Sequence, residues 1–481
     1  MVGRIQPMCV GITIMFSGAM ITASHNPGPD NGIKLVDPKG EMLEAAWESV
    51  ATKLANCKDE DIPTELDQIV QQFNIPDIDS QVVVGRDTRV SSPALSRACL
   101  AGIAAAGGGS MDIGVVTTPQ LHYMVVCINT KGGYGLPSLP GYYEKITTAF
   151  KKFMSLVPDK GAYRNKIVFD GANGVGAPSM VQFKEKLEGV LEVEMVNTGE
   201  GELNSGCGAD FVKVTQGAPQ GLTLSEGTRC VSVDGDADRV LYYYQSPLGF
   251  RLLDGDRIAT LVAGHLKHLL AIAGLTDTIK LGLVQTAYAN GSSTEYISNS
   301  LGVPVSCVPT GVKHLHHKAM DFDIGVYFEA NGHGTVVFSE SAMNIIKEKG
   351  GEKLSTLLDV INQTVGDAIS DLLLVECVLA DRGWDCPDWD KCYTDLPNRL
   401  GKVAVRDRTL VTTTDAERKV VTPEGMQDNI DKIVAEYSKG RSFVRPSGTE
   451  DCVRVYSEAD TRVGADLLNK RVSEMVVQMI G

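Results

Sequence analysis

Short apolar runs alternate with amphipathic segments along most of the chain. An apolar run of about four to eight residues bounded by glycine or polar clusters is typical of a buried strand, and apolar residues three and four positions apart predict a helix. The predicted strands cover 8–23, 33–36, 81–84, 111–116, 166–169, 191–196, 230–233, 240–245, 279–285, 304–308, 324–328 and 335–338. The predicted helices cover 41–55, 93–106, 142–154, 255–271, a segment that begins near 291, and 353–379. This alternation indicates largely parallel sheets covered by helices.

The pattern divides the chain into four predicted domains, 1–140, 141–275, 276–385 and 386–481. Residues 130–140 are rich in glycine and proline and form the first predicted linker. The last domain differs from the others, because short strands at 402–406, 442–444 and 453–458 are combined with helices at 426–437 and 464–479. We therefore predict three mixed α/β domains and a smaller C-terminal α+β domain around a central cleft, since ligands bind beyond the carboxyl ends of strands in open α/β sheets.

Composition and charge limit the partners and the cellular compartment that the chain can have. The chain has 481 residues and a formal net charge of −15, which argues against nucleic acid or an anionic membrane as the main partner. The eleven cysteines are scattered without a CxxC pair and indicate the reduced thiols of a cytoplasmic protein. The apolar segment 8–23 faintly resembles a signal peptide, but it is shorter than the ~20 residues that span a bilayer and is interpreted as a buried strand.

A polar loop at 22–27, with the sequence TASHNP, contains a candidate nucleophile. Serine, asparagine and proline are all turn formers, so the loop taken alone favours a plain turn. Ser24 becomes a phosphoryl carrier if a divalent cation and cationic side chains surround it. The interpretation therefore depends on whether the rest of the chain supplies those groups.

The segment 234–239, with the sequence DGDADR, is the strongest chemical signal. Asp234, Asp236 and Asp238 alternate with small residues and can converge on one hard cation through carboxylate oxygens. An EF-hand would need glycine at the sixth position and glutamate at the twelfth, where this chain has Arg239 and Gln245. The pattern therefore predicts a magnesium site, and the alternative is a solvated acidic turn.

Two further loops are candidates for substrate binding. Residues 445–449 (Arg445, Pro446, Ser447, Gly448 and Thr449), followed by Arg454, combine an arginine fork, hydroxyls and a glycine, as a phosphate site requires. The alternative is a strand-to-turn corner. Residues 329–334, which include Glu329, Ala330 and Asn331, suit sugar hydroxyls but alone are equally typical of a turn.

Several basic residues are candidates for smaller roles. Residues 313–318, KHLHHK, lack the spacing of a zinc site and fit either cations for a phosphosugar or a solvated face. Arg86, Arg89 and His122 are candidates for a cationic wall in the first domain. The residues that could take a proton as general base are Lys34, His122 and Lys313, and the sequence does not choose among them.

The motifs at 22–27, 234–239, 329–334 and 445–450 occur in an order and spacing that resembles the α-D-phosphohexomutase superfamily. Residues 285–291 (QTAYANG), 310–314 (TGVKH) and 331–333 (NGH) are most similar to its eukaryotic phosphoacetylglucosamine mutase branch. The resemblance implies three related α/β domains and a fourth around a cleft. It also implies an isomerase that interconverts N-acetylglucosamine 6-phosphate and 1-phosphate through a sugar bisphosphate and so feeds UDP-N-acetylglucosamine synthesis.

The resemblance also implies roles for individual residues. Ser24 would be the phosphoserine, and one Mg²⁺ would be held by Asp234, Asp236, Asp238 and a phosphate oxygen on Ser24. Glu329 and Asn331 would hold sugar hydroxyls. The phosphate that is not reacting would be held by Arg445, Ser447, Gly448, Thr449 and Arg454. These roles describe a site for a small phosphosugar, with no nucleic acid or membrane involved.

The beginning of the chain departs from the superfamily pattern. Members begin well upstream of the serine loop and carry a GTAGFR-type loop there, which residues 1–18 do not match. We therefore expect a truncated first domain without an edge strand and a cationic wall. An alternative hypothesis is a non-catalytic phosphosugar-binding or assembly protein. A phosphatase or hydrolase with the same metal loop is disfavoured, because the Arg445 loop suits re-binding of a product.

Overall fold

The computed structural model describes residues 15–76, 79–448 and 451–481. The described chain divides into two compact units. Unit 1 contains the described residues up to Gly255 together with 331–337 and 343–387, and unit 2 contains 256–330, 338–342 and the described residues of 388–481. The predicted fold class is confirmed, because mixed sheets with helices are followed by a smaller antiparallel C-terminal sheet.

The first sheet carries the serine loop. Its strand order is β2-β1-β3-β4, and β1 pairs with β3 in parallel and with β2 in antiparallel orientation. The strands are β1 (Phe16–Ile21), β2 (Ile33–Val36), β3 (Gln81–Arg86) and β4 (Gly109–Val115). The helices are α1 (Ala45–Asn56), α2 (Ile62–Gln72), α3 (Ser92–Ala105) and α4 (Thr118–Asn129).

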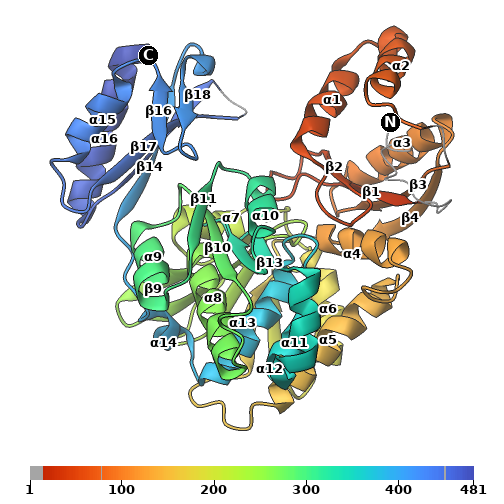
Figure 1. Cartoon of the computed structure of the whole chain (residues 1–481), viewed down its shortest axis with the longest axis horizontal. Coiled ribbons are helices and arrows are strands. Elements are labelled where there is room, and N and C mark those ends of the chain that lie inside the picture. The colour runs from red at the N-terminus through yellow and green to blue at the C-terminus, as the bar shows by residue number, and fades with distance from the viewer. Residues whose placement is uncertain (1–14, 77–78, 449–450) are drawn as a thin grey trace. The chain divides into compact units, whose positions relative to one another are not determined.

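Successive side chains of β1 point to opposite faces of the sheet, and each face has its own hydrophobic core. Met20 packs with Leu121 and Val125 of α4, whereas Ala19 packs with Ile103 of α3 on the other face. Figure 1 shows α3 and α4 on these two faces. Both faces of β1 are therefore buried, which explains why its sequence is mostly apolar up to the polar serine loop.

The second sheet carries the carboxylate loop. Its order is β6-β5-β7-β8-β9, with β5 parallel to β6 and β7, and with β8 antiparallel to β7 and β9. The strands are β5 (Lys166–Asp170), β6 (Glu192–Val196), β7 (Cys230–Val233), β8 (Val240–Ser246) and β9 (Gly249–Leu253). The helices α5 (Leu139–Ser155), α6 (Gly176–Lys186) and α7 (Gly208–Thr215) belong to the same part of the chain.

The third sheet has β10 in parallel between β11 and β12. Its strands are β10 (Leu281–Thr286), β11 (Val305–Val308) and β12 (Ile324–Phe328), and β13 (Gly334–Phe338) follows in sequence. The helical segments are α8 (Gly255–Ile272), α9 (Gly291–Glu295), the π-helix η3 (Tyr296–Leu301), α10 (Val312–Ala319) and α11 (Glu340–Lys349).

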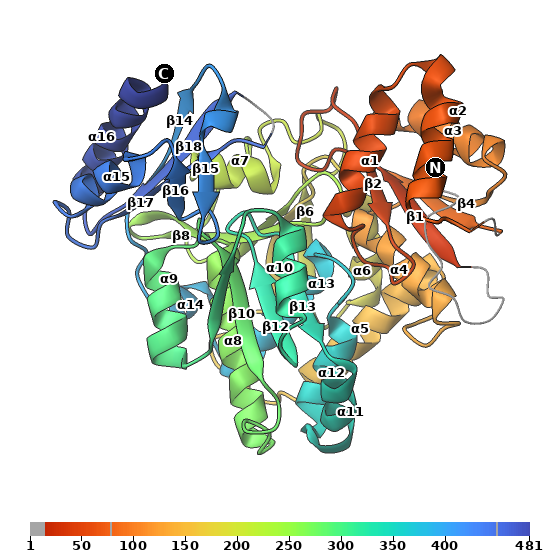
Figure 2. The same ribbon diagram turned by 45° about the horizontal axis from the view of Figure 1, so that its top comes forward.

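The C-terminal sheet is antiparallel with the order β14-β18-β17. Its strands are β14 (Asn398–Ala404), β17 (Arg441–Pro446) and β18 (Cys452–Glu458), and β15 (Thr412–Thr414) pairs with β16 (Lys419–Thr422) as a hairpin. Helices α15 (Met426–Val434) and α16 (Arg462–Ile480) cover one face of the sheet (Figure 2). The short helix α14 (Cys386–Asp390) precedes this domain.

The prediction of one long helix over 353–379 is wrong. The structure has two helices, α12 (Gly351–Val360) and α13 (Ala368–Arg382). Asp367 caps α13, because its Oδ1 accepts hydrogen bonds from the backbone N–H groups of Ile369 and Ser370. The break also lets the Ala368 N–H donate to the Ala237 carbonyl, 3.0 Å away, so it brings the start of α13 to the carboxylate loop.

Two other predictions need correction in the first sheet. The strand predicted over 8–23 is observed only as Phe16–Ile21, and residues 8–14 lie outside the described residues. Helix α4, which begins at Thr118 directly after β4, is absent from the predicted helices. A capping box between Thr117 and Gln120 starts this helix, since each side chain bonds to the other's backbone N–H.

None of the helices in the described ranges is both long and apolar enough to cross a membrane. The ten cysteines of the described chain are free thiols.

A buried ion cluster joins β7 to α13 within unit 1. Arg229 lies 3.0 and 2.8 Å from the two carboxylate oxygens of Glu376 and 2.6 Å from Asp385. Both Arg229 and Glu376 are buried, and the hydroxyls of Tyr163 and Tyr242 donate to Glu376 as well. Loss of one buried partner leaves the other charge without compensation.

We predict that Arg229→Met lowers the free energy of unfolding by about 3–5 kcal/mol, because Glu376 then stays buried without its cation. Arg164→Ala is the matched control, since Arg164 also pairs with Asp385 but its side chain is 68% exposed. The control is expected to cost less than about 1 kcal/mol. Urea unfolding followed by circular dichroism measures both, and equal losses in the two variants contradict the prediction.

Candidate active site

The carboxylate loop follows β7 and curls around the first of its aspartates. The Oδ1 atom of Asp234 accepts the backbone N–H groups of Asp238 and Arg239 at 3.1 and 3.2 Å. Ala237 adopts a left-handed backbone with φ of 58°, which turns the loop back on itself. As a result Asp234, Asp236 and Asp238 are brought to one buried point, as the alternation of the sequence predicts.

The three carboxylates fit a divalent metal ion. One oxygen from each lies within 4.8 Å of the others, and this is the one group of potential metal ligands found within the described ranges. Asp234 Oδ2, Asp236 Oδ1 and Asp238 Oδ1 are buried and have no hydrogen-bond donor in the part of the chain that the structure describes. Buried oxygens without donors are costly, and a hard cation such as Mg²⁺ satisfies them.

Positive charge from three segments surrounds these carboxylates. Lys34 Nζ, from β2, lies 2.8 Å from Asp236 and 2.6 Å from Asp238. Arg239 and His333 lie within 3.6 to 3.9 Å of Asp238. Burial alone would raise the pKa of Asp238, but the His333, Lys34 and Arg239 charges outweigh it and lower that pKa. Asp234 keeps a raised pKa, because burial and its two aspartate neighbours prevail there.

Ser24 lies against the same group. Its Oγ is 3.2 Å from Asp236 Oδ2, the oxygen that also accepts from Lys34. The backbone N–H of Ser24 donates to the Thr22 hydroxyl, and the residue is held at φ of 48°, a conformation that non-glycine residues rarely adopt. The structure therefore brings together four residues that the sequence proposes for the reaction centre: Ser24, Asp234, Asp236 and Asp238.

Thr118 is a site residue that sequence reasoning missed. Its hydroxyl donates to Asp236 Oδ2 at 2.6 Å, and its N–H donates to the Asp236 carbonyl at 3.1 Å. Thr118 is the first residue of α4, so its N–H has no acceptor within the helix and donates to the carboxylate loop instead. The capping box at Thr117 was a readable signal for this helix start.

The predicted sugar loop contributes its histidine to the carboxylate loop. Gly332 has φ of +89°, and a Cβ there would lie 2.1 Å from the Val240 carbonyl oxygen, so only glycine allows this close approach. It places His333 Nδ1 3.6 Å from Asp238, while Asn331 Oδ1 accepts the His333 N–H. Glu329 follows the end of β12 and Ala330 comes next, and both are half-buried.

In unit 2, Arg445 is fixed by two partners. Its Nε donates to the Tyr288 hydroxyl at 3.0 Å, and its Nη1 lies 3.1 Å from Glu417. Glu417 in turn accepts from the N–H and hydroxyl of Thr310. Tyr288 and Thr310 belong to the two motifs, 285–291 and 310–314, whose role the sequence left open. Both motifs therefore hold the arginine that the sequence proposes for phosphate binding.

The rest of the predicted phosphate loop surrounds the end of β17. Arg454 pairs directly with Arg445 across β18 and β17, so two positive charges lie side by side at the end of β17. Ser447 is buried and its N–H donates to the Cys452 carbonyl. Pro446 ends β17, Gly448 is exposed, and Thr449 lies outside the described residues.

The candidates for the general base have different surroundings. Lys34 shares Asp236 with Ser24, whereas His122 is buried in α4 with its Nδ1 2.8 Å from the Gly40 carbonyl oxygen. Lys313 is half-buried at the start of α10 in unit 2. The position of His122 in the packing between α4 and the turn at Gly40 leaves Lys34 as the candidate that the structure places beside Ser24.

Arg86 and Arg89, the candidates for a cationic wall, each have a carboxylate partner. Arg86 pairs with Asp112 at 3.1 Å, and Arg89 is buried behind the serine loop and ion-paired with Asp87. The histidines of 313–318 do not form a zinc site within the described ranges, since His316 faces the Tyr327 hydroxyl and His314 and His317 are exposed.

Four family models match consecutive parts of the chain. Residues 11–61 and 67–135 match "Phosphoglucomutase/phosphomannomutase, alpha/beta/alpha domain I", and 138–241 match "Phosphoacetylglucosamine mutase AMG1, domain II". Residues 254–384 match domain III of the latter family, and 400–475 match the phosphoglucomutase/phosphomannomutase C-terminal domain. Each motif of the site lies in or beside one of these matched segments.

Individual proteins are similar over nearly the whole chain. The phosphoacetylglucosamine mutase of Sus scrofa is 50% identical over 477 residues, which cover 96% of this chain and 88% of that protein. The Aspergillus fumigatus N-acetylphosphoglucosamine mutase, solved with GlcNAc-6P and magnesium, is 49% identical with a TM-score of 0.91, covering 96% of this chain and 89% of that one. A serine-to-alanine variant of the Aspergillus protein, solved with glucose 1,6-bisphosphate, also has a TM-score of 0.91 at 49% identity, covering 96% and 88%.

We predict that Asp236→Asn weakens Mg²⁺ binding at least about tenfold, because it removes one of three carboxylate ligands. Asp112→Asn is the matched control, since Asp112 is an exposed carboxylate that pairs with Arg86 away from the loop. Isothermal titration with MgCl₂ measures the affinity of each variant. If Asp236→Asn and Asp112→Asn bind Mg²⁺ equally well, the carboxylate loop is not the metal site.

Proposed function

We propose that this chain, which belongs to the phosphoacetylglucosamine mutase family of the α-D-phosphohexomutase superfamily, interconverts N-acetylglucosamine 6-phosphate and N-acetylglucosamine 1-phosphate. The activity is that of an isomerase that moves a phosphoryl group between two oxygens of one sugar. The observation that carries the proposal is the contact of Ser24 with Asp236 inside a buried group of three carboxylates. A hydroxyl in such a place can accept and return a phosphoryl group if a metal ion balances the charge.

We assign the phosphoserine to Ser24. In the first half-reaction the bond from phosphorus to Ser24 Oγ breaks, a bond to a sugar hydroxyl oxygen forms, and the hydroxyl proton leaves. The product is a sugar bisphosphate, and in the second half-reaction its other phosphoryl group returns to Ser24 Oγ. Asp234, Asp236, Asp238 and a phosphate oxygen on Ser24 would hold one Mg²⁺, which neutralises charge on the transferring group.

The proton must pass through a group close to Ser24, and Lys34 is our candidate. Lys34 Nζ and Ser24 Oγ contact the same carboxylate oxygen of Asp236, so a sugar oxygen that reacts at Ser24 comes within reach of Lys34. Burial alone would lower the pKa of Lys34, but the charges of Asp236 and Asp238 outweigh it and raise that pKa, so Lys34 would take the proton only as the neutral amine, once a metal ion holds these two carboxylates in its place. His122 is a weaker candidate, because its ring is buried against the Gly40 carbonyl.

We assign the phosphate that is not reacting to the loop 445–449 and Arg454, and sugar hydroxyls to Glu329 and Asn331. The cross-strand pair of Arg445 and Arg454 supports the first assignment, since it places two positive charges side by side. A phosphate bound there competes with Glu417 for the Arg445 guanidinium. A loop that holds the far phosphate favours a mutase over a hydrolase, because a hydrolase has no need to hold the product for a second transfer.

The non-catalytic alternative is not favoured. The chain covers 88% of the Sus scrofa protein, the family models include one for domain I, and the first sheet holds Ser24 beside the carboxylates. We also propose that the chain has four domains, 1–140, 141–275, 276–385 and 386–481. They carry the serine, metal, sugar and phosphate loops in that order.

We also propose a setting for this reaction. The product, a sugar 1-phosphate, is the form that a nucleotidyl transfer consumes, and we place the reaction in UDP-N-acetylglucosamine biosynthesis in the cytoplasm. The net charge of −15, with cations confined to the motifs, supports a small phosphosugar as the partner.

The purified chain, given N-acetylglucosamine 6-phosphate, Mg²⁺ and a trace of glucose 1,6-bisphosphate, is expected to form the 1-phosphate without releasing free phosphate. Ser24→Ala lowers kcat by a factor on the order of 10³ or more, since it removes the group that carries the phosphoryl. Ser49→Ala, at an exposed serine of α1, is the control and leaves kcat unchanged.

Two outcomes, one in this assay and one in the assay combined with calorimetry, contradict the proposal. Free phosphate formed in step with substrate loss indicates a hydrolase. Binding of the phosphosugar in a calorimeter without any turnover indicates the non-catalytic alternative.

A further inference from the structure

The backbone carbonyls of Ser24 and Asn26 each accept hydrogen bonds from two side chains, those of Arg89 and Asn204, which together we call the grip. Arg89 Nη2 donates to the Ser24 carbonyl at 3.0 Å and to the Asn26 carbonyl at 2.8 Å. Asn204 Nδ2 donates to the same two carbonyls, at 2.9 and 3.0 Å. Arg89 follows β3 of the first sheet, whereas Asn204 lies in the loop between β6 and α7 of the second. The serine loop is therefore gripped from two sides by residues far apart in sequence.

Each side chain of this grip is itself fixed. Arg89 is buried and ion-paired with Asp87, whose other carboxylate oxygen accepts from the Ser92 hydroxyl at 2.6 Å. Asn204 has a left-handed backbone with φ of 58°, and its N–H donates to the Ala172 carbonyl at 3.0 Å. Because other contacts already fix these two side chains, no conformational entropy is lost when they bind the serine loop. The donors of the grip are therefore preorganised.

The carboxylate loop approaches the same point. A Cβ added to Gly235 would lie 2.6 Å from the Ser24 carbonyl oxygen and 2.9 Å from Asn204 Nδ2. The backbone at Gly235 thus lies directly against the gripped carbonyl. A grip that fixes this carbonyl therefore also fixes the distance between the Ser24 side chain and the carboxylates beside Gly235.

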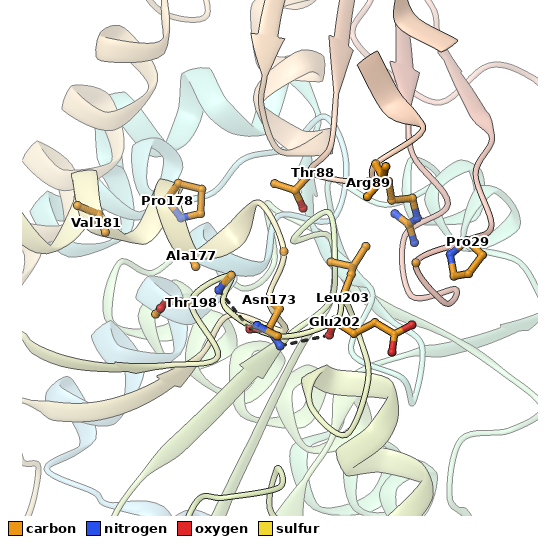
Figure 3. A pocket seen from close by; sticks show the side chains of 15 residues that line it. Pro29, Thr88, Arg89, Asn173, Ala177, Pro178, Val181, Thr198, Glu202 and Leu203 are labelled. Carbon is orange, nitrogen blue, oxygen red and sulfur yellow. Dashed lines mark hydrogen bonds between the residues drawn. The ribbon is translucent and has the colours of Figure 1, made fainter. Parts of the chain in front are cut away.

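Side-chain packing does not fill the space beside the grip. A cavity of about 730 Å³ lies there. Figure 3 shows side chains that line it, Arg89 and Pro29 from the first domain and Leu203, Glu202 and Asn173 from the second. Gly28 and Pro29, which continue the serine loop, line it as well. On the side that faces the cavity, no side chains pack against the serine loop. The hydrogen bonds to Arg89 and Asn204 therefore help to fix the position of the loop.

We propose that Asn204 and Arg89 are positioning residues that hold Ser24 in line with the carboxylate loop for phosphoryl transfer. This inference rests on the proposed function, in which Ser24 carries the phosphoryl group. The left-handed conformation of Ser24 is unfavourable and persists only where the surroundings enforce it. Asn204 reaches the loop from the domain that bears the carboxylates, so it couples the position of the nucleophile to that of the metal ligands.

The test compares Asn204→Ala with Glu202→Ala. Glu202 lies in the same loop and its side chain is exposed, so its variant controls for a general disturbance of the loop. Three quantities are measured on the full chain: kcat and KM for N-acetylglucosamine 6-phosphate, the rate at which glucose 1,6-bisphosphate phosphorylates Ser24, and the Mg²⁺ affinity. The melting temperature of each variant is recorded as well.

A positioning role predicts a split between these quantities. In Asn204→Ala, kcat and the rate of Ser24 phosphorylation fall together by roughly 10- to 100-fold, since small misplacement of a reacting group costs this much. KM and Mg²⁺ affinity stay within about threefold, because neither the phosphate loop nor the carboxylates change, and the melting temperature falls by less than about 4 °C. Glu202→Ala behaves like the parent chain.

A double-variant cycle with Arg89→Lys adds a second criterion. Lysine keeps a positive charge beside Asp87 but lacks the planar fork of arginine. Because Arg89 and Asn204 hold the same two carbonyls, their effects on kcat are expected to be non-additive. Strictly additive effects contradict a shared grip.

Two results overturn the inference. The first is an unchanged kcat in Asn204→Ala. The second is a parallel loss of kcat, Mg²⁺ affinity and melting temperature, which indicates a general structural role. Should Asn204→Ala not fold, Asn204→Asp, which keeps the size but loses the donors, is judged by the same criteria. Failure of the proposed function is distinguishable, because in that case Ser24 of the parent chain is not phosphorylated at all.

Discussion

Three carboxylates buried within 4.8 Å of one another repel each other strongly, and unit 1 is built to compensate this repulsion. Two like charges at that separation cost on the order of 3 kcal/mol at an effective dielectric constant near 20. Lys34 comes from β2, Thr118 from the start of α4 and His333 from the loop before β13, and each contacts Asp236 or Asp238. Segments that are hundreds of residues apart thus meet because the aspartates need opposite charge and donors. A divalent cation meets the same need.

The loops around this point adopt backbone conformations that ordinary residues avoid. Left-handed non-glycine residues are found at Ser24, Ala172, Asn173, Asn197, Asn204 and Ala237. Such conformations are unfavourable and persist where the surroundings over-determine them, as they do around reacting groups. The hydrogen bonds from Arg89 and Asn204 to the serine loop are one such constraint, and the contact of Ala368 with Ala237 is another. The site therefore depends on rigid placement from both sheets of unit 1.

Features that depend on neighbouring residues could be predicted from the sequence, and features that depend on contacts between distant segments could not. The strands 33–36, 230–233 and 324–328 were predicted with the observed bounds, because local apolar runs determine them. The carboxylate cluster was predictable as well, since its three members lie within five residues. Thr118, His333 and Asn204 were missed as partners of the centre, because their contacts arise only when distant segments fold together. The predicted helix over 353–379 was wrong, because the apolar spacing continues through a break that the cap at Asp367 enforces.

The most direct test of this account is the identification of the residue that carries the phosphoryl group. The chain is incubated with Mg²⁺ and glucose 1,6-bisphosphate that bears a labelled phosphoryl group, and its peptides are analysed by mass spectrometry before and after a chase with N-acetylglucosamine 6-phosphate. The account predicts one labelled phosphoryl group on Ser24, which the chase removes from the protein and transfers to the sugar. Turnover with Ser24 unmodified throughout, or with the label on another residue, would contradict it.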